Sequence, residues 1–280
     1  MMQRAPFGVR LAEATATLGP LCVGIDPHPE LLRAWGLPVD PDGLRRFART
    51  CVEAFAGHVA LVKPQSAFFE EYGSAGIQVL EETLAAFRVS GTLTLLDVKR
   101  GDIGSTMAGY ARAYLADGSP LAADAITVSP YLGFGSLAPA IALAGQTGRG
   151  VFVLALTSNP EGAQVQHARD DQGSVAGAVV AGAREANAAA LSEGHLGHVG
   201  LVVGATIGSA ATDLGIDLTT VNGPLLAPGF GAQGADAAAI RRLFGAALPA
   251  VLPSSSREVL GAGPDLRDLR AAAYGAWPGE

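Results

Sequence analysis

Four charged residues stand close together within residues 95–103, namely Asp97, Lys99, Arg100 and Asp102. On a β-strand, side chains two positions apart point to the same side, so Asp97 and Lys99 would share one face. Burying two such charges is costly unless each is matched, which argues against a plain packing role. Flanking carboxylates favour the charged form of a lysine, which suits an acid and not a nucleophile. A surface salt bridge is the alternative interpretation.

Other apolar runs of the chain also end in polar residues. These ends are Asp26, Lys63, the run Thr157-Ser158-Asn159, the run Gly229-Phe230-Gly231 and the run Ser254-Ser255-Ser256-Arg257. One polar strand end carries little information, because every strand must stop somewhere. In a barrel of parallel strands, however, all carboxyl ends meet at one mouth, where the active site lies. Charges of both signs at these ends therefore predict a functional mouth.

The elements that would position these residues form a repeated pattern of short apolar runs and Ala-rich stretches. We predict strands over residues 22–26, 59–64, 92–99, 125–130, 150–157, 199–206, 224–229 and 250–254. We predict crossover helices over residues 41–57, 74–88, 105–116, 136–144, 175–191 and 235–248. Continuous apolar strands suit a parallel sheet covered by helices.

Eight such units in 280 residues fit an α/β fold, a (β/α)8 TIM barrel. A doubly wound open sheet is the main alternative. We expect a single domain over residues 1–280, with residues 1–20 and 262–280 as terminal helical extensions.

Composition limits the classes of function. Apolar residues make up 49% of the chain, enough for a sizeable core, and the formal charge of −7 argues against a nucleic-acid partner. No apolar run reaches the roughly 18 residues of a membrane span, and the N-terminus lacks the apolar core of a signal peptide. Cys22 and Cys51 have no zinc or disulfide spacing and are expected to be buried free thiols. We therefore expect a cytoplasmic protein that binds neither nucleic acid nor membrane.

Seven blocks of the sequence carry a resemblance to a known family. Residues 94–111 read TLLDVKRGDIGSTMAGYA, which resembles the signature of the orotidine 5′-phosphate decarboxylase family. Six further blocks are similar to others of that family, in the same order: GIDPHPELL, LVKPQSAFFEEYG, VSPYLGFGS, LTSNPEGAQVQ, APGFGAQGAD and PSSSREV. The resemblance is to the longer bacterial, type 2-like branch. It implies a carboxy-lyase that converts orotidine 5′-phosphate (OMP) to UMP and CO2 in pyrimidine biosynthesis, without a cofactor or metal.

The resemblance also implies which residues form the site. A charged tetrad of Lys63, Asp97, Lys99 and Asp102 would carry the chemistry, with the Lys99 ammonium stabilising and then protonating a carbanion at C6. Asp102 and Thr106 would reach the active site of a neighbouring subunit, so the enzyme would be a homodimer with shared sites. The other substrate-binding residues would be Asp26, Ile103, Ser158, Pro228, Gly229, Gln233, Gly234, Ser256 and Arg257.

Individual contacts with substrate follow from the same resemblance. Asp26 and Lys63 would bind the ribose hydroxyls, and Ser158 would contact the pyrimidine. Gln233 would bridge pyrimidine and phosphate, while Arg257 would form a bidentate ion pair with the phosphate. The backbone of Gly229, Gly231 and Gly234 would approach the phosphate closely. Judged without the resemblance, the glycines also fit ordinary turns and the serine fits a helix cap.

Several features stay open at the level of sequence. His195 and His198 are more typical of surface residues than of a metal site, because no third ligand is visible. The polar loop over residues 160–174 is either a lid or a surface excursion. A rival function is a Mg²⁺-dependent lyase or aldolase on a related barrel, but Lys63 stands where such enzymes have an acidic metal ligand. A second rival is an inactive nucleotide-binding or scaffold protein.

Overall fold

The structure is a computed structural model that describes residues 4–229 and 237–277. Within these residues, eight parallel strands close into a barrel in the order β1-β10-β9-β8-β5-β4-β3-β2. The strands are β1 (Cys22–Ile25), β2 (Leu61–Pro64), β3 (Leu93–Arg100), β4 (Ala125–Val128), β5 (Gly150–Leu156), β8 (Val199–Val203), β9 (Leu225–Pro228) and β10 (Val251–Ser255). The predicted TIM barrel is confirmed, and the open-sheet alternative is wrong because β1 pairs with β10.

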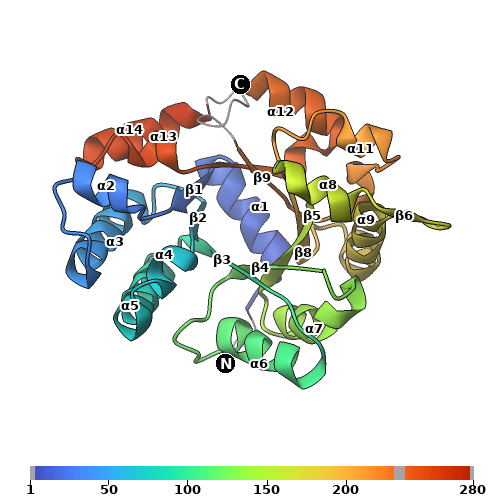
Figure 1. Ribbon diagram of the computed structural model, residues 1–280, viewed down its shortest axis with the longest axis horizontal. Helices are drawn as coiled ribbons and strands as arrows, with labels where there is room; N and C mark the ends of the chain where they lie inside the picture. Colours follow the sequence, from blue (N-terminus) through green and yellow to red (C-terminus); the bar gives the residue numbers. More distant parts are fainter. Residues whose placement is uncertain (1–3, 230–236, 278–280) are drawn as a thin grey trace.

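Helices surround the barrel in the expected places (Figure 1). They are α2 (Pro29–Ala34), α3 (Pro41–Phe55), α4 (Ala67–Glu70), α5 (Gly73–Ser90), α6 (Gly104–Leu115), α7 (Ala138–Gln146), α8 (Ala163–Gln166), α9 (Val175–Ala186), α10 (Ala188–Ser192), α11 (Ala210–Asp213), α12 (Ala237–Phe244), α13 (Arg257–Leu260) and α14 (Leu266–Ala276). Short 3₁₀ turns lie at η1 (Phe134–Leu137), η2 (Pro160–Gly162), η3 (Leu218–Val221) and η4 (Gly245–Ala250). None of the helices described here has the length and apolarity that a membrane crossing requires.

Two predicted helices are interrupted for local reasons. The helix expected over residues 175–191 breaks at Asn187, whose side-chain amide donates to the backbone oxygens of Val199 and Val221. This buried asparagine ties the break to the barrel, since its Oδ1 also accepts from the Val199 N–H. The helix expected over residues 235–248 gives way to η4 at Gly245, which has a φ of +47°.

Helix α3 shows how the sequence defines an outer helix. Asp40 caps its N-terminus by accepting a hydrogen bond from the Gly43 N–H, and Pro41 occupies the first turn, where its missing N–H costs nothing. Apolar side chains at helical spacing, including Phe47 and Cys51, are fully buried against the barrel and α5. Trp35 packs on Phe47 and donates from Nε1 to a backbone oxygen, so it is a packing residue.

The interior of the barrel is filled by apolar side chains and closed at its N-terminal end by helix α1 (Phe7–Leu18). This helix lies across the centre of the ring of strands in Figure 1. Its Phe7 and Leu11 are buried together with inward-facing residues such as Phe152, whose ring meets that of Phe7 edge to face at 6.1 Å. The N-terminal end of the barrel is therefore sealed, and substrate access is left to the opposite end.

Candidate active site

Polar residues replace apolar ones inside the barrel one layer above this interior core. Inward-facing side chains recur every two residues along a strand. The residue two positions after an inward-facing core residue therefore faces the barrel interior at the mouth. The pairs are Leu61 and Lys63, Leu95 and Asp97, Ala125 and Thr127, and Leu252 and Ser254. The carboxyl ends of β2, β3, β4 and β10 thus carry one continuous polar layer over an apolar floor.

Asp97 is the centre of this layer and is almost fully buried. Its Oδ2 lies 3.1 Å from the Nζ of Lys63, and its Oδ1 lies 2.7 Å from the Nζ of Lys99. Lys63 continues the chain of charges, because its Nζ lies 3.9 Å from Oδ1 of Asp26. The structure thus brings together Asp26, Lys63, Asp97 and Lys99 in alternating sign, and the surface salt bridge considered from sequence is wrong for Asp97.

Two neutral side chains complete the surroundings of Asp97 and were not identified from the sequence. Thr127 donates from Oγ1 to Oδ1 of Asp97 at 2.7 Å, and Gln65 donates from Nε2 to Oδ2 at 2.9 Å. Burial alone would raise the pKa of Asp97, but Lys63, Lys99 and the hydroxyl of Thr127 lower it well below its usual range. Asp97 is therefore a permanently charged carboxylate that organises its neighbours.

Lys63 is also held in its charged form. Burial would lower the pKa of its ammonium, yet the carboxylates of Asp26 and Asp97 outweigh this effect and raise the pKa above its usual value. Burial also raises the pKa of the neighbouring Cys22 thiol, to about 12. For a thiol, a raised pKa favours the neutral form. Both Cys22 and Cys51 are buried free thiols, as expected. Cys22 is consequently a neutral packing residue beneath the charged layer.

Lys99 differs from Lys63 in exposure and in backbone conformation. Its side chain is 47% exposed, so the ammonium that Asp97 holds on one side remains open to a ligand on the other. Its φ is +45°, the left-handed region that a residue with a Cβ seldom adopts, and the pairing of β3 with β4 shifts between Leu96 and Arg100. The Lys99 N–H donates to Oγ1 of Thr127 at 2.9 Å. Such strain at a functional residue indicates that its position is fixed by the surrounding structure.

A cavity of about 400 Å³ opens beside this cluster. Its lining includes Asp26, Lys63, Ser256 and Arg257, together with Pro228 and Gly229 at the end of β9. Within the described residues, Oδ1 of Asp26 and Oγ of Ser256 are buried without a hydrogen-bond partner. Buried polar atoms are normally paired, so these two are available to hydroxyl or phosphate groups of a ligand.

His28, Gln65, Phe68 and Ser254 also line the cavity. Ser254 was predicted at the mouth as part of a polar strand end, whereas His28, Gln65 and Phe68 were not identified from the sequence. The rings of His28 and Phe68 pack at a tilt of 59° with their centroids 4.1 Å apart and form one wall. Gln65 could have been found from its place two residues after Lys63, which puts it on the same side of the strand end. His28 and Phe68 lie in loops and short helices, where no periodicity identifies an inward face.

Other predicted site residues lie away from the cluster in this single chain. Asp102 accepts a hydrogen bond from the Ile103 N–H at 2.8 Å, and no contact joins it to Lys99. Ile103 and Thr106 are exposed at the start of α6, and Ser158 is exposed after β5. Gln233, Gly234 and Gly231 lie outside the described residues.

The loop over residues 160–174 contains η2, α8 and a small antiparallel ribbon of β6 (Arg169–Asp170) and β7 (Gly173–Ser174). Gln166 anchors it to the end of β5 through hydrogen bonds with the N–H and hydroxyl of Thr157. His195 pairs with Glu193, whereas His198 approaches the Ile141 oxygen, and the two imidazoles do not share a site. Across the part of the chain that is described, no group of three His, Cys, Asp or Glu residues could hold a metal ion.

Comparisons with known proteins agree with this geometry. Residues 19–272 match the family model described as orotidine 5′-phosphate decarboxylase / HUMPS family. A relative from Salinispora arenicola named orotidine 5′-phosphate decarboxylase is 63% identical over 268 residues, which cover 95% of this chain and 94% of the relative. A relative of the same name from Streptomyces coelicolor is 57% identical over 270 residues, 96% of this chain and 94% of the relative.

Solved structures show the same likeness in three dimensions. A crystal structure from Streptomyces avermitilis is 56% identical with a TM-score of 0.94, covering 98% of this chain and 94% of the other. The OMP decarboxylase of Leishmania donovani is 31% identical with a TM-score of 0.71, covering 96% and 95%. By sequence, fold and the residues at the barrel mouth, the chain belongs to the orotidine 5′-phosphate decarboxylase / HUMPS family.

Proposed function

We propose that this protein is an orotidine 5′-phosphate decarboxylase that converts OMP to UMP and CO2 in de novo pyrimidine biosynthesis. The observation that carries the proposal is the alternation of charge at the barrel mouth, where buried Lys63 and Asp97 are followed by the half-exposed Lys99. Relatives with this name that are 53–63% identical over nearly the whole chain support it.

The cavity suits a ribose phosphate. Asp26 and Lys63 offer an acceptor and a donor for the ribose hydroxyls, and Oδ1 of Asp26, which accepts no hydrogen bond in the described residues, supports this role. Gly229 has a φ of +98° and lines the cavity at the end of β9, where barrel enzymes commonly bind phosphate. Arg257 at the start of α13 would pair with the phosphate oxygens, and Pro228 and Ser256 would line the same end.

The chemistry rests on the exposed ammonium of Lys99. When the bond between C6 and the carboxylate breaks, its electron pair stays on C6, and CO2 leaves. The Lys99 ammonium stabilises this charge, transfers a proton to C6 and is reprotonated from solvent. Asp97 holds Lys99 from the opposite side at 2.7 Å, which fixes the direction in which the ammonium points. Such pre-positioned charge is the largest single contribution in many enzymes.

Asp97 would also lie near the substrate carboxylate. Two anions about 4 Å apart repel by roughly 4 kcal/mol at an effective dielectric of 20, a penalty that disappears when CO2 leaves. How much ground-state repulsion contributes to such reactions is contested. We therefore assign the larger share of catalysis to stabilisation of the carbanion by Lys99.

We further propose a cytoplasmic homodimer whose active sites are shared. Asp102 does not reach its own Lys99, and it lies with exposed Ile103 at the mouth-side start of α6. Exposed Tyr131 and Leu132 follow β4 at the same end of the barrel and supply apolar surface for an interface. Asp102 and Thr106 would enter the partner's site across this interface, and Ser158 would contact the pyrimidine. The whole chain, including α1 and α14, would form one domain.

A Mg²⁺-dependent lyase or aldolase on the same barrel is the rival within this family. Such an enzyme needs acidic ligands at the strand ends, but Lys63 points into the mouth from β2 and is held as a cation by Asp26 and Asp97. A cation at this position repels a metal ion, which favours the decarboxylase.

The direct test is the loss of OMP absorbance with purified protein, with and without EDTA, alongside Lys99→Ala. We expect chelator-insensitive formation of UMP that collapses in the variant. The control Lys99→Arg keeps the charge but loses the proton donor, and it should bind UMP while turning over slowly. Absence of conversion by the folded wild-type protein would refute the assignment, and activity restored by Mg²⁺ on a sugar phosphate would establish the rival.

The shared site has its own test. Asp102→Asn and Lys99→Ala should each be nearly inactive, because each damages both sites of a homodimer. A mixture that exchanges subunits should regain about a quarter of wild-type activity, since half of the dimers then carry one intact site. A mixture that stays as inactive as its components would refute a shared site and leave the decarboxylase assignment untouched.

A further inference from the structure

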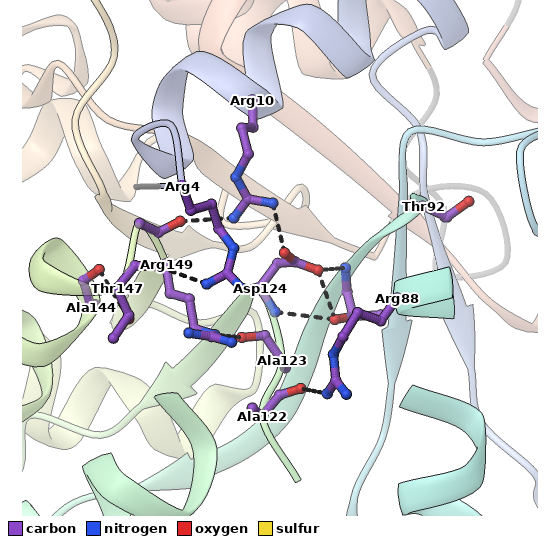
Figure 2. Close-up of polar contacts among 12 residues, drawn as sticks. Arg4, Arg10, Arg88, Thr92, Ala122, Ala123, Asp124, Ala144, Thr147 and Arg149 are labelled. Carbon is purple, nitrogen blue, oxygen red and sulfur yellow. Dashed lines mark hydrogen bonds and ion pairs between the residues drawn. The ribbon is translucent and has the colours of Figure 1, made fainter. Parts of the chain in front are cut away.

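Four arginines gather at the N-terminal end of the barrel, opposite the mouth. Arg4 precedes α1, Arg10 lies on α1, Arg88 lies near the end of α5, and Arg149 directly precedes β5. Together with Asp124, which precedes β4, they line a cavity of about 150 Å³. Figure 2 shows Arg4, Arg10 and Arg149 placed around Asp124, with Arg88 beside them. We call this group of four arginines the basal arginine site.

Positive charge exceeds negative charge at the basal arginine site. Among the residues that line the cavity, Asp124 is the one carboxylate, and its Oδ1 accepts from Arg10 at 2.7 Å while its Oδ2 accepts from Thr94. Asp117, at the edge, accepts from Arg4 at 3.1 Å and from Arg149 at 2.7 Å. Arginine stays charged in proteins. Within the described residues, these two carboxylates leave two of the four positive charges uncompensated.

Backbone oxygens hold the arginines in place without neutralising them. Arg4 donates to the Thr147 oxygen at 2.7 Å, Arg10 to the Gly148 oxygen at 2.7 Å, and Arg88 to the Ala122 oxygen at 2.6 Å. Arg149 is almost fully buried and donates from Nε to the Ala123 oxygen at 2.9 Å.

One donor of this group has no acceptor at all. In the part of the chain that the structure describes, Nε of Arg10 is buried without a hydrogen-bond partner. Buried donors are nearly always paired, so an unpaired one beside a cavity points to a missing acceptor. The guanidinium groups are thus held around a cavity whose one lining carboxylate, Asp124, leaves Nε of Arg10 without an acceptor.

We propose that the basal arginine site binds a small, doubly charged oxyanion of the inorganic phosphate class. The cavity holds the volume of about five water molecules at ~30 Å³ each, which accommodates a tetrahedral oxyanion. Guanidinium groups bind such oxyanions through paired hydrogen bonds. A dianion also matches the two uncompensated charges. The site is therefore distinct from the substrate cavity, which opens at the opposite end of the barrel.

A bound oxyanion would join elements that are distant in sequence. Arg10 belongs to the helix that seals the barrel interior with Phe7 and Leu11, whereas Arg88 and Arg149 belong to the barrel wall and its outer layer. Binding would fasten this helix to the barrel and stabilise the folded state in proportion to the ligand concentration. Activity at the mouth would be unchanged at temperatures where the protein is fully folded.

The test measures phosphate binding by titration calorimetry and the melting temperature at constant ionic strength, in phosphate, sulfate or chloride. Excess UMP occupies the mouth, so that the remaining phosphate binding reports on the basal arginine site. We expect one phosphate per chain under these conditions and a higher melting temperature in phosphate or sulfate than in chloride. Arg88→Gln should weaken phosphate binding about tenfold or more, in line with the loss of a charge-assisted contact.

Arg184→Gln is the matched control, because Arg184 is exposed on α9, does not line the cavity, and its replacement changes the net charge equally. It should bind phosphate as the wild type does. If Arg88→Gln does not fold in chloride, Arg4→Gln provides the same comparison. Equal melting temperatures in phosphate and chloride, or unchanged binding by the folded variant, would overturn the proposal. A protein that fails to bind UMP would refute the proposed function, while the comparison of the two variants would still test the basal arginine site.

Discussion

Thr127 offers the sharpest test of how the mouth positions its charges. Its hydroxyl donates to Oδ1 of Asp97 at 2.7 Å and accepts from the N–H of Lys99 at 2.9 Å. The residue is 1% exposed, so water cannot replace these contacts. Thr127→Val keeps nearly the same shape and removes only the hydroxyl. The variant therefore isolates one polar group that holds both an anion and the strained backbone of Lys99, the proposed proton donor.

The expected cost follows from the two hydrogen bonds. A hydrogen bond to a charged group contributes about 1.5–3 kcal/mol, and a buried N–H left unpaired costs about 1–3 kcal/mol. The added methyl group returns roughly 0.8 kcal/mol through burial. We expect the free energy of unfolding to fall by about 2–5 kcal/mol, as the balance of these effects. If about 1.5 kcal/mol of this is lost from the transition state, kcat falls roughly tenfold.

The assay combines urea unfolding with steady-state conversion of OMP. KM should change little, because Thr127 does not line the cavity. Thr83→Val is the control, since Thr83 is also buried but donates only to a backbone oxygen of its own helix at 2.6 Å. This control should keep the wild-type kcat. If Thr127→Val loses stability but retains kcat within twofold, Thr127 is a packing residue and the positioning argument fails.

Three further predictions concern the same layer. Lys63→Met leaves Asp26 and Asp97 without their shared cation, so we expect a loss of about 3–5 kcal/mol in urea unfolding and a fall in kcat/KM. Because the pKa of Asp97 is lowered on folding, its carboxylate contributes to the free energy of unfolding above pH ~4, and this contribution disappears as the pH falls below that value. The free energy of unfolding of the wild type should therefore drop more steeply below pH ~4 than that of Asp97→Asn. Gly24→Ala would place a Cβ 2.6 Å from the Cβ of Ser256. We expect urea unfolding to show a loss of about 1–3 kcal/mol, and titration to show weaker UMP binding.

The barrel could be predicted from the sequence because its strands are buried on both faces and therefore read as apolar runs. Their ends could not be placed as well. The strand predicted over residues 125–130 stops at Val128, and the one predicted over residues 199–206 stops at Val203, where Gly204 turns. The sequence pattern continues past Val128 and Val203. Each strand ends where its hydrogen bonding with the neighbouring strand ends, and the pattern along one strand does not show that point.

Within the site, charge and spacing were sufficient for Asp97 and Lys99 but not for their neutral partners. Thr127 is one hydroxyl in the apolar strand Ala125–Val128, and a β-branched residue is ordinary there. Its role arises from the register shift between β3 and β4, which no pattern along one strand encodes. The positive φ of Lys99 could not be predicted from the sequence either, because glycine is the residue that usually signals this backbone conformation.

The two ends of the barrel use positive charge in different ways. At the mouth each lysine is matched by carboxylates, so the cluster is nearly neutral and a bound OMP carboxylate adds an anion beside Asp97. In the proposed mechanism, loss of CO2 removes that anion and creates charge at C6, next to Lys99, whose ammonium has a proton to give. At the base the arginines exceed their carboxylates and cannot give up protons at ordinary pH. That chemistry suits holding an anion and not transforming it, which is why lysine at the mouth and arginine at the base are not interchangeable.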